Sequence, residues 1–402
     1  MRLSLTFIFS TVMIDAMGIG LIMPVMPALL QEIGSFPLSE AALWGGILAA
    51  SFAVMQFAFG PIIGALSDRF GRRPILLIAL FVMSLDYLVM AVAHVFWLLL
   101  LGRIIGGITA ATQPTAYAAI ADLSSPDEKA ARFGLLGAAF GIGFVFGPMI
   151  GGLLADYGTR APFYAAAALA AANMVLGYFV MPETVTDTNR RSFDLKRANP
   201  FGAFYHVGKT QDFRRLLLMF FFYQVAFFVY PAVWAFFTAE RFGWDEGMIG
   251  LSLGVVGICM AVVQGALVPV FLKRFGEAGT VIWGLGFSMV AFLILAFLSN
   301  GLIALILTPI STLGALVTPA MQGIMSRRTA DDSQGELMGV LTSTAALATI
   351  VSPLLMTSTF AVFAAKDADP YLPGAPFLVS FALMIAATLI FLSRKRIQMA
   401  QN

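Results

Sequence analysis

Residues 64–74 read GALSDRFGRRP, a short polar and cationic loop between two long apolar stretches. An apolar stretch of about 20 residues can cross a bilayer as a helix. The segments on either side of this loop, 41–66 and 74–93, both reach that length. The loop is therefore expected to mark a place where the chain leaves the membrane and returns. Asp68 is expected to accept backbone N–H groups at the start of the following helix.

Extending the search outward from this loop gives twelve apolar segments of spanning length. Only 11% of the 402 residues are charged and 59% are hydrophobic, whereas soluble domains carry about 25% charged residues. The chain is therefore predicted to be an all-α integral membrane protein embedded in a lipid bilayer. The expected transmembrane helices are 5–29, 41–66, 74–93, 96–121, 132–156, 161–181, 214–238, 247–272, 279–298, 300–325, 335–361 and 371–393.

The longest polar break between these segments is 182–213, and it separates two groups of six. We expect an N-terminal six-helix bundle over 1–181, a cytoplasmic linker over 182–213 and a C-terminal six-helix bundle over 214–402. Because each group has an even number of spans, the two bundles are expected to insert into the membrane the same way round.

Lysine and arginine indicate which side of the membrane each loop faces. With the N-terminus in the cytoplasm, 20 of the 24 lysines and arginines fall on cytoplasmic segments. Arg160, Arg241 and Lys366 lie on the outer side, and Arg103 lies within a span. Cytoplasmic loops of membrane proteins carry this excess of positive residues. Both termini are therefore predicted to be cytoplasmic.

The two halves repeat each other at an offset of 205 residues. The tripeptide RFG at 69–71 recurs at 274–276, Pro114 recurs as Pro319, and Pro148 recurs as Pro353. A parallel repeat of this kind, with its axis along the membrane normal, is used by secondary transporters. In such proteins interrupted helices in equivalent positions mark the substrate site. Glycine and proline predict such interruptions in spans 1, 4, 7 and 10, which are therefore the candidates to line a substrate site.

The repeat fails where the N-terminal half carries charge inside its spans. The counterparts of Asp15, Asp86 and Arg103 are Phe220, Ala291 and Thr308. Asp15 lies about 10 residues into its span, which is about 15 Å and close to the middle of the bilayer. Intramembrane acids often belong to proton relays, so Asp15 is a proton-carrier candidate. The alternative is a structural aspartate bonded to a helix terminus at the Gly-rich break.

Asp86 and Arg103 are expected to lie at the same depth. They stand at equal distances before and after the turn near His94, so antiparallel helices bring them level, about 12 Å from the outer surface. A pair lowers the free-energy cost of each charge in the membrane. Two interpretations remain open: a permanent structural salt bridge, or a bridge that protonation or substrate breaks by competing for Arg103. In the second, Asp86 is a proton-carrier candidate beside Asp15, and Arg103 modulates both.

Polar and aromatic side chains of the interrupted spans, together with Gln264 of the eighth span, are candidate substrate-binding residues. The seventh span contains FFFYQVAFFVYPAVWAFF (220–237), and much of this run is also explained by phenylalanines that face lipid. Aromatic faces with a few polar groups suit a flat amphiphilic ligand. The candidates are Gln113, Tyr223, Gln224, Tyr230, Trp234, Gln264 and Gln322.

Three motifs resemble the major facilitator superfamily. Residues 64–74 are similar to its loop signature, LGRIIGGITAATQPT (101–115) to its arginine motif, and GIGFVFGPMIGG (141–152) to its antiporter motif. The resemblance implies two bundles that rock about a central site. It also implies a cytoplasmic gate made by Asp68, Arg69, Arg72 and Arg73. The antiporter motif consists of Gly143, Gly147, Pro148, Gly151 and Gly152, small residues that let helices approach closely.

Further stretches resemble the tetracycline/proton antiporters of that superfamily. They are MIDAMGIGLIMPVMP (13–27), SLDYL (84–88) and FGLLGAAFGIG (133–143), and the likeness covers nearly the whole chain. It implies proton-coupled export of tetracycline-like drugs across the inner membrane of a bacterial cell. Those antiporters carry an aspartate in the ninth span, whereas 280–300 has no acid and Ser288 stands near the expected place. The departure leaves open the substrate and the coupling scheme.

The composition argues against enzymatic and nucleotide chemistry. A single cysteine and two distant histidines offer no metal site or triad, and the net charge of +2 argues against a nucleic-acid partner. The stretch AFYHVGKT (203–210) is similar to a phosphate-binding loop, but alanine replaces its first glycine and no strand precedes it. We expect no enzyme activity, no ATP and no cofactor, with a divalent metal present only if the substrate chelates it. The alternatives are a metabolite importer or symporter and a transport-inactive membrane sensor.

Overall fold

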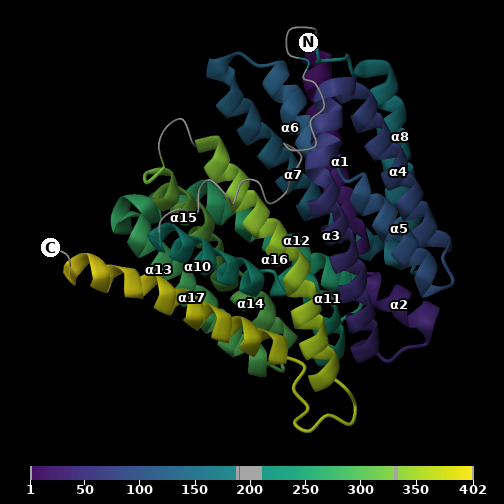
Figure 1. Ribbon diagram of the computed structural model, residues 1–402. Coiled ribbons are helices and arrows are strands. Elements are labelled where there is room, and N and C mark those ends of the chain that lie inside the picture. The colour runs from purple at the N-terminus through teal and green to yellow at the C-terminus, as the bar shows by residue number, and fades with distance from the viewer. Residues whose placement is uncertain (1, 187–189, 191–210, 330–333, 401–402) are drawn as a thin grey trace. The chain divides into compact units, whose positions relative to one another are not determined.

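The computed structural model describes residues 2–186, 190, 211–329 and 334–400 (Figure 1). Within these residues the chain forms helices joined by turns and contains no strand, which confirms the predicted all-α fold. Most of the expected linker lies outside the described residues, and so does the stretch 203–210 that is similar to a phosphate-binding loop.

The N-terminal half contains eight helices among its described residues, because two of its spans are interrupted. They are α1 (Arg2–Ile22), α2 (Met26–Gly34), α3 (Leu38–Phe70), α4 (Arg72–Val92), α5 (Phe96–Ile108), α6 (Thr112–Asp122), α7 (Pro126–Ala155) and α8 (Ala161–Val180).

The described part of the C-terminal half includes one π-helical and one 3₁₀ segment. The elements are α10 (Gln211–Phe227), α11 (Val229–Phe242), α12 (Glu246–Val262), η1 (Val263–Leu267), α13 (Val268–Phe297), α14 (Gly301–Thr312), η2 (Leu313–Leu316), α15 (Val317–Ser326), α16 (Gln334–Phe363) and α17 (Ala375–Ala400).

Helix length and composition confirm the expected number of spans. The described residues contain 11 helical stretches long and apolar enough to cross a membrane. One of them, Glu246–Phe297, is 52 residues long. Within it Gly276 has φ 64° and ψ 179°, a conformation outside any helix. Two spans therefore meet at Gly276, and the total becomes the twelve that the sequence predicts.

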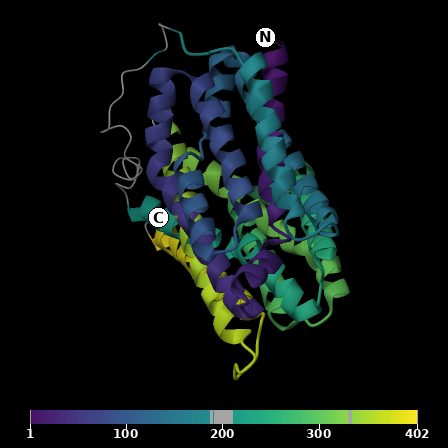
Figure 2. The same ribbon diagram turned by 90° about the vertical axis from the view of Figure 1, so that its right-hand side faces the viewer.

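The described residues divide into two compact units. The first consists of residues 1–36, 51–200 and 244–257, and the second of 37–50, 201–243 and 258–402, in each case where the structure describes them. Each unit thus takes a short piece from a span of the other half, at the start of α3 and in α12. Within the first unit α8 packs against both α1 and α4 (Figure 2).

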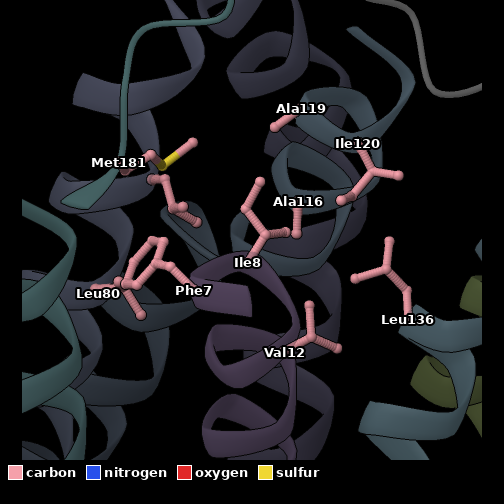
Figure 3. Packing of buried hydrophobic residues seen from close by; sticks show 10 residues of the cluster. Phe7, Ile8, Val12, Leu80, Ala116, Ala119, Ile120, Leu136 and Met181 are labelled. Carbon is pink, nitrogen blue, oxygen red and sulfur yellow. The ribbon is translucent and has the colours of Figure 1, made fainter. Parts of the chain in front are cut away.

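The core of the first unit lies where α1, α4, α6 and α7 meet. Figure 3 shows Ile8 of α1 beside Ala116 of α6, and Phe7 of α1 beside Leu80 of α4, which is how close packing fills a core. The buried members are Phe7, Ile8, Val12, Leu76, Leu80, Ala116, Ala119, Ile120, Leu136 and Met181. In the second unit the two irregular segments η1 and η2 pack on each other through Val263, Val268, Ala315 and Leu316.

Interrupted helices occur at equivalent positions of the repeat, as expected. The first span breaks at 23–25 between α1 and α2, and the seventh breaks at Phe228 between α10 and α11. The fourth span breaks at 109–111, and the tenth changes to a 3₁₀ helix at Leu313–Leu316. At an offset of 205 these breaks coincide. The interruptions therefore belong to the repeated backbone design.

Candidate functional site

Asp15 lies on the part of α1 that presses against the antiporter motif of α7. The motif glycines recur every fourth residue, so they form one stripe along α7. A Cβ on Gly147 would come within 2.7 Å of the Met17 carbonyl oxygen. Cβ atoms on Gly143 and Gly151 would overlap the carbonyl oxygens of Met13 and Leu21. The glycines therefore allow the backbone of α7 to touch the backbone of α1 on both sides of Asp15.

The carboxylate of Asp15 lies beside the break in the fourth span, where α6 begins. Its Oδ1 is buried and has no hydrogen-bond partner among the described residues. Thr112, the first residue of α6, lies beside this carboxylate, and its own buried hydroxyl has no partner in the described part of the chain. The start of a helix favours negative charge. Tyr87 also lies near Asp15, with its hydroxyl against Gly18.

Asp86 and Arg103 form a buried ion pair, which confirms that they lie at the same depth. The two residues are 3% and 9% exposed. Asp86 Oδ1 and Arg103 Nε have no hydrogen-bond partner within the described ranges. Gly102 and Gly106 make room for the pair, since a Cβ on either would approach an Asp86 carboxylate oxygen to 2.8 or 2.7 Å. The pair is therefore only partly satisfied.

The Arg103 guanidinium makes a second contact on its other side. Its central carbon lies 5.0 Å from the centre of the Phe52 ring on α3. Gly107 brings that helix close, because a Cβ there would lie 2.5 Å from the Phe52 carbonyl oxygen. Sequence reasoning did not identify Phe52, although the GRIIGG spacing around Arg103 was a usable signal. The ring gives the guanidinium a contact that persists if the carboxylate becomes neutral.

The loop residues 64–74 converge on Arg72. Its guanidinium pairs with Asp68 at 2.5 Å and with Asp122, at the end of α6, at 3.2 Å. One arginine therefore ties together the ends of the second, third and fourth spans. Arg73 lies over the Tyr178 ring at 5.4 Å, and Arg69 lies over the Phe70 ring at 5.2 Å.

The expected role of Asp68 at the helix start is wrong. The backbone N–H groups of Arg72 and Arg73 donate hydrogen bonds to the carboxylate of Glu183, at 2.8 and 3.3 Å. Asp68 instead engages the Arg72 side chain. Sequence reasoning missed both Glu183 and Asp122, which are distant in sequence. Gly71, with φ 112°, leaves the space that the Glu183 carboxylate occupies.

The antiporter motif also has a second packing face, toward α12. A Cβ on Gly152 would lie 2.6 Å from the Glu246 carbonyl oxygen. A Cβ on Gly250 would overlap the carbonyl oxygen of Pro148. The motif therefore packs against the backbones of two helices at once, α1 and α12.

The proposed substrate-binding residues differ in how they are placed. Tyr223 is 1% exposed and donates its hydroxyl to the Gly314 carbonyl oxygen of η2 at 3.0 Å. Trp234 is buried, whereas the Tyr230 hydroxyl is buried without a partner in the described residues. Gln264 is exposed and lies in the π-helical segment η1, a geometry often found at functional sites. The half-buried amides are Gln113, Gln224 and Gln322.

Ser288 stands in the ninth span near the place where the antiporters that this sequence resembles carry an aspartate. It is 1% exposed, and its hydroxyl has no hydrogen-bond partner among the residues described. The space around it is limited by Gly314, because a Cβ on that glycine would overlap the Ser288 hydroxyl. The ninth span thus keeps a buried polar atom beside the break in the tenth span.

Comparisons with known proteins agree on one family. Residues 8–353 match the family model described as the Major Facilitator Superfamily. The chain is similar to "Tetracycline resistance protein, class C" of Escherichia coli, with 41% identity over 90% of each chain. It is also similar to "Tetracycline resistance protein, class D" of Salmonella ordonez, with 38% identity over 87% of each chain. Among solved structures, the human organic anion transporter MFSD10 (TETRAN) superposes with a TM-score of 0.71 at 25% identity and covers 97% of this chain and 99% of its own.

Proposed function

This chain belongs to the Major Facilitator Superfamily, and we propose that it is a proton-coupled secondary transporter that exports a hydrophobic or amphiphilic drug. Tetracycline-like compounds are the first candidates, because the similarity to tetracycline resistance proteins spans 90% of the chain. The proposed cycle is alternating access by two six-helix bundles, 1–181 and 214–402, joined by a cytoplasmic linker. The proposed setting is a bacterial inner membrane with both termini in the cytoplasm.

The observation that carries proton coupling is the position of Asp15. Its Oδ1 is buried and unpartnered beside Thr112, at the break of the fourth span. A carboxyl group in that position can take up a proton without first breaking a hydrogen bond at that oxygen. The neutral and charged forms also differ in how well they suit the start of α6, which favours negative charge. We assign Asp15 as the principal proton carrier.

Asp86 and Arg103 are proposed to couple protonation to the conformational change. Protonation of Asp86 removes the charge that Arg103 neutralises. The guanidinium then keeps its contact with the Phe52 ring and becomes available to another anion. A buried charge that loses its partner is strongly unfavourable, so protonation at this site favours a rearrangement.

The loop cluster is proposed to gate the cytoplasmic side. Arg72 links three span ends through Asp68 and Asp122, and Arg69 and Arg73 complete the cluster. The proposed substrate contacts are Gln264 of the π-helical segment η1 and the amides and aromatic groups of the interrupted spans, namely Gln113, Tyr223, Gln224, Tyr230, Trp234 and Gln322. Irregular backbone of this kind is tolerated in a membrane only where it is buried in protein or lines a cavity.

The test is drug-driven proton movement in proteoliposomes. Purified protein is reconstituted with a pH-sensitive dye inside, and a panel that includes tetracyclines is added. We expect a proton signal with at least one compound, its loss in Asp15→Asn, and its retention in Asp156→Asn, the same chemical change at an exposed loop position. A compound that is transported with no proton signal would refute the coupling, and an Asp15→Asn protein that still couples would refute the assignment.

A further inference from the structure

Three charged residues of the N-terminal loop cluster have counterparts of opposite charge in the C-terminal half. At the repeat offset of 205, Asp68 corresponds to Lys273, Arg72 to Glu277 and Asp122 to Arg327. The first set reads acid, base, acid, and the second reads base, acid, base. We define the first set as the N-clasp and the second as the C-clasp.

The central contact of the two clasps is the same. In the N-clasp, Arg72 pairs with Asp122 across 50 residues. In the C-clasp, Glu277 pairs with Arg327, again across 50 residues. Random surface charges do not reproduce an ion pair at matched positions with opposite polarity. The backbone before the pair is also shared, because Gly71 and Gly276 both have positive φ, 112° and 64°.

Each clasp holds the far end of a half-helix that begins at a break. In the first unit α6 runs from the break at 109–111 to Asp122. In the second unit α15 runs from the 3₁₀ segment η2 to Ser326, and Arg327 follows as its C-terminal cap. A helix segment that is interrupted at one end and held at the other can pivot when the hold is released. The clasp therefore determines whether the end of the half-helix that lies away from the break can move.

A second hydrogen bond holds the end of the half-helix in each half, and its donor is a different residue type in the two halves. In the N-terminal half, Arg132 donates to the Leu123 carbonyl oxygen at 2.7 Å and joins the end of α6 to α7. In the C-terminal half, Gln334 donates to the carbonyl oxygens of Ser326 and Thr329, both at 2.9 Å, and joins the end of α15 to α16. The arrangement is kept while its residues change, which indicates that the hold on the half-helix matters.

We propose that Glu277 and Arg327 are positioning residues that hold the cytoplasmic end of the tenth span, as Arg72 and Asp122 hold the fourth. The proposal rests on the proposed transport function. Glu277 is mostly buried with 16% of its side chain exposed, whereas Arg327 is 71% exposed. An exposed pair shifts an equilibrium constant by up to about fivefold. A transporter whose states lie within a few kcal/mol of each other responds to a shift of that size.

The experiment exchanges the two charges. Glu277→Arg and Arg327→Glu are made singly and together, and drug-driven proton uptake is measured in proteoliposomes. We expect each single variant to lower the maximal rate about two- to fivefold, while the half-saturating drug concentration changes less than about twofold. The double variant is expected to recover to within about twofold of the parent. Arg274→Glu is the matched control, since its guanidinium faces the Phe275 ring at 5.7 Å.

A second readout does not depend on transport. A cavity of about 260 Å³ is lined by Glu277, Ala278, Ile324, Arg327 and Arg328. In a Cys259→Ser background, Ile324→Cys is labelled with a membrane-impermeant maleimide. Labelling is expected to accelerate severalfold in the single charge variants and to return to the parent rate in the double variant, with unchanged thermal unfolding.

The outcomes separate the two proposals. If the double variant is as impaired and as rapidly labelled as the single variants, or if the single variants behave like the parent, the C-clasp plays no positioning role. If the parent protein shows no drug-driven proton signal but labelling follows the expected pattern, the proposed function fails and the clasp stands.

Discussion

The two halves of the molecule share a backbone design and differ in chemistry. Their interruptions fall at the same repeat positions, as do Gly71 and Gly276 with positive φ. By contrast, the buried Asp86–Arg103 pair of the N-terminal half has no counterpart among the described residues of the C-terminal half, where Ala291 and Thr308 take the two positions. We interpret the breaks as serving a movement common to both halves, and the buried charges as serving the proposed proton coupling of one half.

The largest expected effect tests this division at the buried pair. Arg103→Leu leaves the Asp86 carboxylate uncompensated in the membrane, and breaking a buried pair in this way costs about 3–5 kcal/mol. We expect a clear fall in the thermal unfolding temperature in detergent and loss of proton coupling. The double variant Asp86→Leu with Arg103→Leu should regain most of the stability without regaining coupling.

The matched control is the counterpart in the other half. Thr308 is buried, and its hydroxyl bonds the Ala304 carbonyl oxygen of its own helix at 3.2 Å. Thr308→Val should therefore cost no more than about 1 kcal/mol. An Arg103→Leu protein that unfolds at the parent temperature would show that the pair is dispensable and that the halves do not differ as argued.

A smaller effect is expected from exchanging one helix contact between the halves. Gly147 packs against Gly20, whereas its counterpart Ser352 donates a hydrogen bond to the carbonyl oxygen of Val225, the counterpart of Gly20, at 2.8 Å. Gly147→Ser adds a Cβ within 2.7 Å of a backbone oxygen, and such overpacking costs about 1–3 kcal/mol.

The reverse change, Ser352→Gly, removes one hydrogen bond and a better helix former, which together cost about 1–2 kcal/mol. Thermal unfolding of both variants measures the difference. We also expect Gly147→Ser to slow transport more than Ser352→Gly, because the glycine stripe flanks Asp15. Equal losses of transport in the two variants would show that the glycine stripe of the antiporter motif matters no more for transport than its counterpart in the other half.

Much of this comparison was accessible from the sequence. Span number, the depth of Asp86 and Arg103, and the interruptions follow from periodicity, composition and the repeat, which are local or evenly spaced signals. Hydrogen-bond acceptors that only tertiary packing brings to a site could not be predicted from the sequence in this way. Glu183 lies 111 residues from Arg72, and only the folded bundle places its carboxylate at that helix start.

The C-clasp illustrates a signal that was present but unused. The offset of 205 relates Arg72 to Glu277, yet a search for identical residues rejects this pair because the charges differ. A search for conserved interactions with reversed sign would have found it. Repeats in membrane proteins should therefore be compared by pairs as well as by single residues.

Gly71 and Gly276, which occupy equivalent repeat positions and both have positive φ, offer a sharper test of the shared backbone. Gly71→Ala is strained at φ 112°, and its Cβ would also overlap the Glu183 carboxylate. Gly276→Ala is strained at φ 64° and ψ 179° but meets no atom within 4 Å. Strain of this kind costs about 1–3 kcal/mol per residue. The unfolding temperature of Gly71→Ala should be lower than that of Gly276→Ala. The opposite order would show that the Glu183 side chain can move aside.

The smallest effect concerns the loops that the sequence predicts to face outward, where each half holds the end of its third span with an arginine. Arg160 bonds the Ala91 carbonyl oxygen at 2.7 Å, and Arg241 bonds that of Leu298 at 3.0 Å. The second half adds a bond from the Tyr371 hydroxyl to Glu240 at 2.7 Å. Burial, together with this bond and the charge of Glu240, raises the pKa of Tyr371 to about 12.

Because the Tyr371 pKa in the folded state exceeds the value of about 10 in an unfolded chain, its contribution is complete below pH 10. That contribution is lost as the pH rises through 12. Tyr371→Phe is therefore expected to cost less than about 1 kcal/mol for a partly exposed bond. The difference in unfolding temperature between parent and variant should stay constant from pH 6 to pH 9. A difference that shrinks across that range would mean that Tyr371 ionises in its folded environment far more readily than its contact with Glu240 allows.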